Sequence, residues 1–333
     1  MYHELRKRGT RPNDVRPNCR HVLVIPDSAC IIVPPAPNAD ISPMDAPNPS
    51  ANPTFASRTP LHIGAVGVAV RDLDKVGRYY RDLLGLSELA REASTVRLGA
   101  GGVPLIELTH RPDAKPDDAR EAGLYHTAFL MPTRADLGRW VKRIAVTRVP
   151  VSGASDHGVS EAIYLDDPEG NGVEVYADRP PEAWHWRDGL VDMPTEALDV
   201  EDLVRAAEGD YAEAPAGLRV GHIHLRVGDV DAAEKFYQGG VGLTRTRQRG
   251  GAAFMSSGRY HHHVATNVWH SRGAGPRDDD RAGLAWFAVE VDDPAALAAL
   301  AARLRAAGAP IIASETGFET ADPWGTRIRM VAG

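Results

Sequence analysis

The sequence is poor in cysteine, in long apolar runs and in excess positive charge. Its only two cysteines, Cys19 and Cys30, lie near the N-terminus, so the rest of the chain has no thiol for a disulfide framework, a zinc–thiolate cluster or a cysteine nucleophile. No apolar run approaches the roughly 18 residues of a membrane-spanning helix or resembles a secretory signal. Basic residues number 38 against 45 acidic ones, which disfavours a nucleic-acid partner. We therefore expect a cytoplasmic protein in which any metal is held by His and carboxylate.

The composition indicates a globular chain with a different N-terminal segment. With 333 residues, of which 43% are hydrophobic and 25% charged, the chain is long enough for two domains. Residues 1–58 are rich in proline and polar residues and have little periodicity, so we expect a disordered tail. Because Met44 stands shortly before the patterned sequence, we also consider the hypothesis that translation naturally starts there.

An internal repeat organises the remaining chain. Residues 64–86 align without a gap onto residues 221–243, and residues 123–132 match residues 283–292. The second and fourth units each contain a DP-x-G turn after their helical stretch, at residues 167–170 and 322–325. The sequence therefore predicts four units of roughly fifty residues each.

Each unit has the pattern of one helix and four strands. A strand of period two opens the unit, an aspartate such as Asp72 or Asp229 caps the following helix, and short β-rich runs separated by glycine come after it. The runs on either side of the DP-x-G turn at residues 167–170 are typical of a β-hairpin. Residues 179–218 contain two tryptophans and one short predicted helix at 200–207, so we interpret them as a packed connector.

Four β-α-β-β-β units of this kind resemble the vicinal oxygen chelate superfamily, which includes glyoxalase I, fosfomycin-resistance proteins and extradiol ring-cleaving dioxygenases. The runs LYHTAFLMPTRADL, DHGVSEAIYLDDPEGNGVEVYADRP, GHIHLRVGD and YHHHVATNVWHS are similar to the two-domain catechol 2,3-dioxygenase-like subfamily. The resemblance implies an α+β fold of four βαβββ units paired into two half-open barrels. We expect one barrel from residues 59–178 and the other from residues 219–333.

In this superfamily the first and last strands of the units carry the metal ligands. Inward-facing residues of different strands can converge in a cavity, so single His and Glu side chains suffice. The resemblance places His126, Glu174 and Glu107 at such positions of the N-terminal barrel, which we take as the preferred metal site. His157, just before a strand, is a candidate base or a structural loop residue.

The C-terminal barrel has only part of the ligand set of a ring-cleaving dioxygenase. His222 stands at a first-strand position, but Trp286 and Arg329 occupy the places of the second histidine and the carboxylate, and an arginine cannot bind a metal. His222 and His263 could still bind a metal, with His262 and Tyr260 as catalytic groups. The candidate substrate-binding residues are His224, His261, Asn267 and Arg329.

The resemblance implies metal-dependent extradiol cleavage of a catechol-type aromatic by O₂. Fe(II) is the expected metal, with Mn²⁺, Zn²⁺ or Ni²⁺ as alternatives, and a homodimer is a further expectation because sheet edges can pair between subunits. Two other functions stay open. One is a glyoxalase-like Lewis-acid enzyme, favoured by the set Glu107, His126 and Glu174; the other is a metal-free protein that binds a small molecule.

Overall fold

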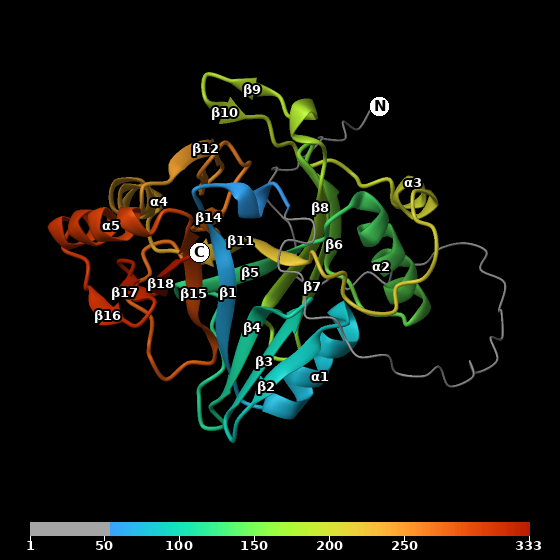
Figure 1. Cartoon of the computed structure of the whole chain (residues 1–333), viewed down its shortest axis with the longest axis horizontal. Helices are drawn as coiled ribbons and strands as arrows, with labels where there is room; N and C mark the ends of the chain where they lie inside the picture. Colours follow the sequence, from blue (N-terminus) through green and yellow to red (C-terminus); the bar gives the residue numbers. More distant parts are fainter. Residues whose placement is uncertain (1–53) are drawn as a thin grey trace, which may run out of the picture.

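The computed structural model describes residues 54–333, which form two curled sheets with helices on their outer faces (Figure 1). The first two units contain β1 (Leu61–Val70), α1 (Leu73–Leu84), β2 (Ser87–Arg91), β3 (Thr95–Ala100) and β4 (Val103–His110), then β5 (Gly123–Leu130), α2 (Arg134–Val146), β6 (Gly153–Asp156), β7 (Ser160–Asp166) and β8 (Gly172–Asp178). The third unit contains β11 (Arg219–Arg226), α4 (Val230–Glu234) with a π-helical continuation at Lys235–Val241, β12 (Thr244–Arg249), β13 (Ala252–Ser256) and β14 (Val264–Asn267). The fourth contains β15 (Gly283–Val291), α5 (Pro294–Ala306), β16 (Ile312–Ser314), β17 (Gly317–Ala321) and β18 (Arg327–Ala332). Within residues 54–333, no helix is long and apolar enough to cross a membrane.

The four units confirm the predicted β-α-β-β-β pattern. Asp72 and Asp229 cap their helices by accepting hydrogen bonds from the backbone N–H groups of Lys75 and Ala232, which satisfies one of the free donors of the first turn. The same two helices end at Gly85 and Gly242, both in the left-handed conformation that a residue without a Cβ adopts easily.

The DP-x-G turns are also equivalent. Asp167 Oδ1 accepts from the backbone of Glu169 and Asn171, and Asp322 Oδ1 accepts in the same way from Trp324 and Thr326. The first turn joins β7 and β8 in an antiparallel hairpin, as predicted. These turns therefore set the register of the strands on either side.

The expectation that consecutive units pair is wrong. The first sheet has the order β16-β17-β18-β15-β1-β4-β3-β2 and joins the first unit to the fourth, whereas the second sheet, β12-β13-β14-β11-β5-β8-β7-β6, joins the second unit to the third. Neither barrel therefore corresponds to residues 59–178 or 219–333. A repeat predicts the structure of each unit but carries no information on which unit it pairs with.

The first strands of paired units lie side by side at the centre of each sheet. β5 and β11 are antiparallel, with His126 opposite His224, and β8 and β14 flank them in parallel. A continuous apolar core joins both sheets and their helices. The second sheet thus brings the histidine-rich strands of the two middle units into one half-barrel.

The connector between the middle units packs against this half-barrel. It contains a 3-10 turn at Pro181–Ala183, the short hairpin β9 (Trp186–Arg187) and β10 (Leu190–Val191), and the helix α3 (Val200–Arg205), which lies beside α2 (Figure 1). A Cβ on Gly138 of α2 would lie 2.5 Å from the carbonyl oxygen of Leu203, so the two helices meet at a glycine. The side chain of Trp184 is buried.

The disordered tail predicted for residues 1–58 is wrong for its last five residues, 54–58, which are ordered. Residues 1–53, including the hypothetical start at Met44, lie outside the described residues. Ala56–Arg58 form a 3-10 turn in which Ala56 is buried, and the ring of Phe55 contacts those of Trp184 and Tyr260. The burial of Ala56 and the packing of the partly buried Phe55 explain the order of this segment.

Candidate metal centre and substrate pocket

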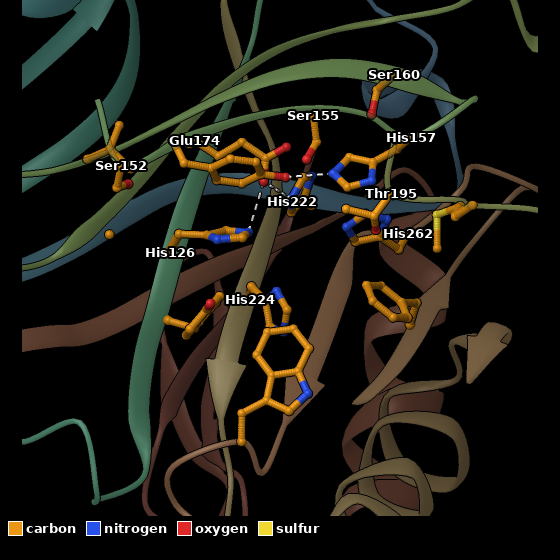
Figure 2. Close-up of a pocket in the computed structure, with 18 of the residues that line it drawn as sticks. His126, Ser152, Ser155, His157, Ser160, Glu174, Thr195, His222, His224 and His262 are labelled. Atoms are coloured by element: carbon orange, nitrogen blue, oxygen red, sulfur yellow. Dashed lines mark hydrogen bonds and ion pairs between the residues drawn. The ribbon is translucent and has the colours of Figure 1, made fainter. Parts of the chain in front are cut away.

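Three buried side chains from three neighbouring strands converge in the second half-barrel: His126 of β5, Glu174 of β8 and His222 of β11 (Figure 2). Oε2 of Glu174 lies 3.0 Å from Nε2 of His126 and 3.2 Å from Nε2 of His222. The candidate ligand atoms all lie within 4.8 Å of one another. His126 and Glu174 belong to the second unit and His222 to the third, so the cluster depends on the pairing of these units.

The donor set fits a divalent metal. Ligands at about 2.1 Å from a metal and at right angles to each other are separated by about 3 Å, which is the separation of Oε2 of Glu174 from Nε2 of each histidine. Nε2 of His126 is buried but makes no hydrogen bond within the described residues, although it lies close to the carboxylate. An unpartnered buried polar atom of this kind costs about 1–3 kcal/mol, which a metal bond would offset.

The strand register leaves one side of this cluster free of a fourth ligand. In the second unit, Glu174 pairs with Ala128, which stands two residues after His126. In the third unit, the residue two positions after His222 is His224, and it pairs with Ala265. Ala265 therefore stands where a second carboxylate would be, and it has no ligand atom. Two histidines and one carboxylate are also the residue types of the 2-His-1-carboxylate sets that hold divalent metals.

The protonation states also suit metal binding. Burial opposes the charge on Glu174, but the interactions with His222 and His126 outweigh it and hold the pKa of Glu174 well below its usual value. Burial lowers the pKa of His222 to about 4 despite the neighbouring carboxylate. At neutral pH Glu174 is therefore ionised and His222 is neutral, the states in which these groups bind metals.

The cluster opens into a pocket of about 680 Å³ (Figure 2). Its walls come from the middle units and from the connector, which supplies Met193 and Thr195. The connector pairs with β6 through Asp156 and Glu196, and it contacts β12 through Asp192 and Arg247. Since β6 and β12 are the two edges of this sheet, the connector spans the open side of the half-barrel.

His262 lies on the pocket wall with its ring centroid 4.1 Å from that of His222. Its Nδ1 lies 2.8 Å from Nδ1 of His261, whose Nε2 lies 2.9 Å from Oδ1 of Asp178. Because a carboxylate only accepts, Nε2 of His261 carries a hydrogen; in the neutral form of His261 its Nδ1 then accepts from Nδ1–H of His262. Burial lowers the pKa of His262 well below its usual value, so Nε2 of this neutral ring has a free lone pair.

His157 also lines the pocket, and both of its nitrogens are engaged. Nδ1 lies 2.8 Å from the carbonyl oxygen of Pro194, which can only accept, so Nδ1–H donates. In the neutral ring Nε2, 2.7 Å from the hydroxyl of Tyr164, then accepts from it. Desolvation and the nearby Glu174 carboxylate raise the pKa of Tyr164 well above its usual value, so its hydroxyl stays protonated.

The remaining histidine of the pocket is His224. Its Nε2 accepts from Nδ2 of Asn267 at 3.0 Å, and its ring packs between Tyr125 and Trp269. Burial lowers the pKa of His224 well below its usual value, which keeps the ring neutral. His224 and Asn267 thus stabilise one wall of the pocket.

Several residues singled out in the sequence lie outside this pocket. Glu107 and Arg329 are on the other sheet, where Glu107 pairs with Arg97 at 2.9 Å and Arg329 lies over the ring of Trp286. The structure therefore does not bring Glu107 to the metal cluster, nor Arg329 to the pocket.

Tyr260, His261 and His263 lie behind the pocket wall. The hydroxyl of Tyr260 bonds to Tyr176 and Asp178, which places it beside the Asp178–His261 pair. His263 is buried among Thr59, Ser256 and the carbonyl oxygen of Ala56. The three consecutive histidines thus alternate in direction, and only His262 lines the pocket.

Tyr164, Arg247 and Arg249 also line the pocket and were not predicted from the sequence. Tyr164 lies directly opposite Glu174 in the β7–β8 hairpin. The DP-x-G turn could have indicated this, because a hairpin turn fixes which residues face each other.

Burial of His263 predicts a loss of stability in acid. Burial lowers the pKa of His263 to about 3, against 6.5 in the unfolded chain, so its stabilising effect is complete above pH 6.5 and is lost as the pH falls toward 3. At pH 4 the burial of His263 should lower the free energy of unfolding by about 3 kcal/mol relative to neutral pH. We expect the unfolding free energy of His263→Gln, from urea titrations of metal-free protein, to fall less steeply between pH 7 and 4. His110→Gln, at the exposed end of β4, should keep the wild-type slope; equal slopes in all three proteins would contradict the prediction.

Comparisons with known proteins show the family of the chain. The model of the Glyoxalase/Bleomycin resistance protein/Dioxygenase superfamily matches residues 62–175 and 219–330. A catechol-2,3-dioxygenase of Bacillus subtilis (strain 168) is 36% identical over 269 residues, which cover 79% of this chain and 94% of that protein.

Two solved structures share the fold. A putative dioxygenase from Bacillus subtilis superposes with a TM-score of 0.56 at 15% identity, covering 82% of this chain and 85% of that one. Glyoxalase I from Zea mays superposes with a TM-score of 0.52 at 17% identity, covering 84% and 94%. The family model and the relative from Bacillus subtilis together show that the chain belongs to the glyoxalase, bleomycin resistance protein and dioxygenase superfamily.

Proposed function

We propose that this protein is an extradiol dioxygenase that cleaves a catechol-type aromatic ring with O₂. The observation that carries the proposal is the facial set of His126, Glu174 and His222 at the base of a pocket. This donor set suits Fe(II), and the 36% identical relative is a catechol-2,3-dioxygenase. When bound, Fe(II) would supply the Lewis acidity and the redox activity that ring opening by O₂ requires.

In this proposal His262 is the general base. Its free Nε2 accepts a proton from a hydroxyl of the diol, and the imidazolium that results is stabilised through His261 by the carboxylate of Asp178. His261 and Asp178 act through His262 and are positioning residues.

Tyr164 and His157 form the opposite side of the reacting region. The protonated hydroxyl of Tyr164 is held by His157, whose ring is fixed by the backbone of Pro194. We assign to this pair the orientation of the bound diol and the exclusion of water next to Glu174.

Tyr164→Phe should lower kcat about 5-fold with a small change in KM, because it removes one oriented hydroxyl worth roughly 1 kcal/mol and leaves the metal ligands in place. Steady-state O₂ uptake measures both constants. Tyr211→Phe, which removes a hydroxyl bonded to the backbone of Leu84 away from the pocket, serves as the control and should behave as wild type. An unchanged kcat in Tyr164→Phe would remove this residue from the mechanism.

The function is tested by loading anaerobically purified protein with Fe(II) and following O₂ uptake and absorbance with catechol. Both atoms of O₂ enter the product, so one O₂ should be consumed for each catechol while a yellow ring-fission product appears. Fe(II)-loaded protein that consumes no O₂ with any of several catechols would overturn the proposal.

Changing or removing the metal distinguishes the dioxygenase from the two other functions. The glyoxalase-like ligand set included Glu107, which lies on the other sheet, and a Lewis-acid enzyme would be active with Ni²⁺ or Zn²⁺ without O₂ uptake. A metal-free binding protein would keep its affinity for an aromatic ligand after treatment with a chelator.

A further inference from the structure

Two arginines of the edge strand β12 line the pocket. Arg247 and Arg249 are two residues apart, so they lie on the same face of the strand, and both contact the pocket. A bulge between Arg245 and Arg247 interrupts the alternation, and Arg245 instead approaches Glu234 at 3.5 Å. The bulge thus directs two of the three arginines of this strand to the pocket.

The charges of these two arginines are weakly satisfied. Arg247 donates to the carbonyl oxygen of Val191 at 3.4 Å and contacts the carboxylate of Asp192 at 3.3 Å, but Asp192 is 68% exposed, and exposed ion pairs contribute little. Nε of Arg247 is buried and has no partner among residues 54–333. Arg249 is exposed to solvent at the pocket rim, contacts the hydroxyl of Thr195 at 3.4 Å and has no carboxylate partner within the same residues. A buried guanidinium N–H without an acceptor is costly, which favours binding of an anion here.

The rest of the pocket does not compensate this charge. The described acidic residues of the lining are Glu174, which belongs to the metal cluster, and Asp166, which has an interaction of its own. The volume of about 680 Å³ is in the range of roughly 300–1,000 Å³ typical of pockets for drug-sized ligands, so a single ring leaves room for a substituent.

We propose that the substrate is an aromatic 1,2-diol that carries a carboxylate, which Arg247 and Arg249 bind. This inference rests on the proposed function for the diol and on the two arginines for the carboxylate. An incoming carboxylate replaces the exposed Asp192 beside Arg247 and supplies the acceptor that Nε lacks. The arginines act in substrate selection and take no part in the bond changes.

The test compares 3,4-dihydroxybenzoate with catechol in the Fe(II)-loaded wild type and in Arg247→Met, Arg249→Met and the double variant. We expect the wild type to prefer the carboxylated diol at least 10-fold in kcat/KM. Each single substitution should lower kcat/KM for 3,4-dihydroxybenzoate about 10- to 100-fold, as the loss of a charged hydrogen bond does, and change that for catechol less than about 3-fold. Arg245→Met, on the same strand but outside the pocket, is the matched control and should retain the wild-type preference.

A binding measurement separates this inference from the proposed function. Calorimetric titration of Zn²⁺-loaded protein with each diol under argon requires no turnover. Arginine-dependent preference for 3,4-dihydroxybenzoate without ring cleavage in the iron form would support the carboxylate site and refute the dioxygenase. Ring cleavage with equal affinities for both diols, or equal losses in the Arg247→Met and Arg245→Met variants, would overturn the carboxylate site and leave the dioxygenase in place.

Discussion

Glu174→Gln should eliminate stoichiometric metal binding and catalysis. Glutamine keeps the shape of the side chain but removes the only negative charge of the three-residue cluster, in a site where the carboxylate is 3% exposed. Loss of a residue that hydrogen-bonds to a metal ligand typically lowers the metal affinity about 10- to 100-fold, and loss of a ligand itself should lower it more. We expect metal affinity to fall by more than about 100-fold and ring cleavage to become undetectable. Elemental analysis after gel filtration and O₂ uptake measure the two effects.

Glu107→Gln is the matched control for this substitution. Both glutamates lie in the last strand of a unit, but Glu107 is on the other sheet and pairs with Arg97. The Glu107→Gln variant should bind metal as the wild type does. Stoichiometric, tightly bound metal in Glu174→Gln, or metal loss in Glu107→Gln, would place the metal elsewhere in the fold.

His262→Phe should lower kcat by about 10²- to 10⁴-fold while the metal content stays close to that of the wild type. The phenyl ring can keep the contact with His222, but it has no atom to accept the proton of the diol, and general base catalysis contributes a factor of this size. Turnover and metal content measured on the same sample test this directly. A variant that retains wild-type kcat would exclude His262 as the base.

Asp178→Asn resolves the role of the residues behind His262. An amide at this position can donate to His261, which reverses the hydrogen-bond direction along the chain and places the hydrogen of His262 on Nε2. The variant should therefore lose kcat with little change in KM, whereas a purely structural role would change stability alone. A wild-type pH profile of kcat in Asp178→Asn would remove His261 and Asp178 from the mechanism.

Local structure could be predicted from the sequence because the repeat and its turn residues are local signals. The positions of Asp72 and Asp229 predicted helix starts, and the DP-x-G turn predicted the β7–β8 hairpin. These features depend on hydrogen bonds within a few residues, so one unit suffices to specify them.

The assembly of the metal cluster and its pocket could not be predicted in the same way. His126, Glu174 and His222 were all candidates, but pairing consecutive units placed His222 in a different barrel from the other two. The choice of partner depends on packing between strands far apart in the chain, which periodicity does not report. Arg247 and Arg249 were missed because TRTRQR reads as a solvent-exposed edge, and the connector that turns this edge into a pocket wall is irregular.

The pairing of the units also sets an order for folding during synthesis. The second and third units are neighbours in the chain and can form their half-barrel as soon as residue 267 has left the ribosome. β1, in contrast, has an unpaired edge until β15 emerges, and an unpaired edge invites pairing with other chains. A chain truncated before β15 would contain every proposed metal ligand and still aggregate through its first unit. β15, which is synthesised after the middle units, thus covers the edge that β1 leaves open.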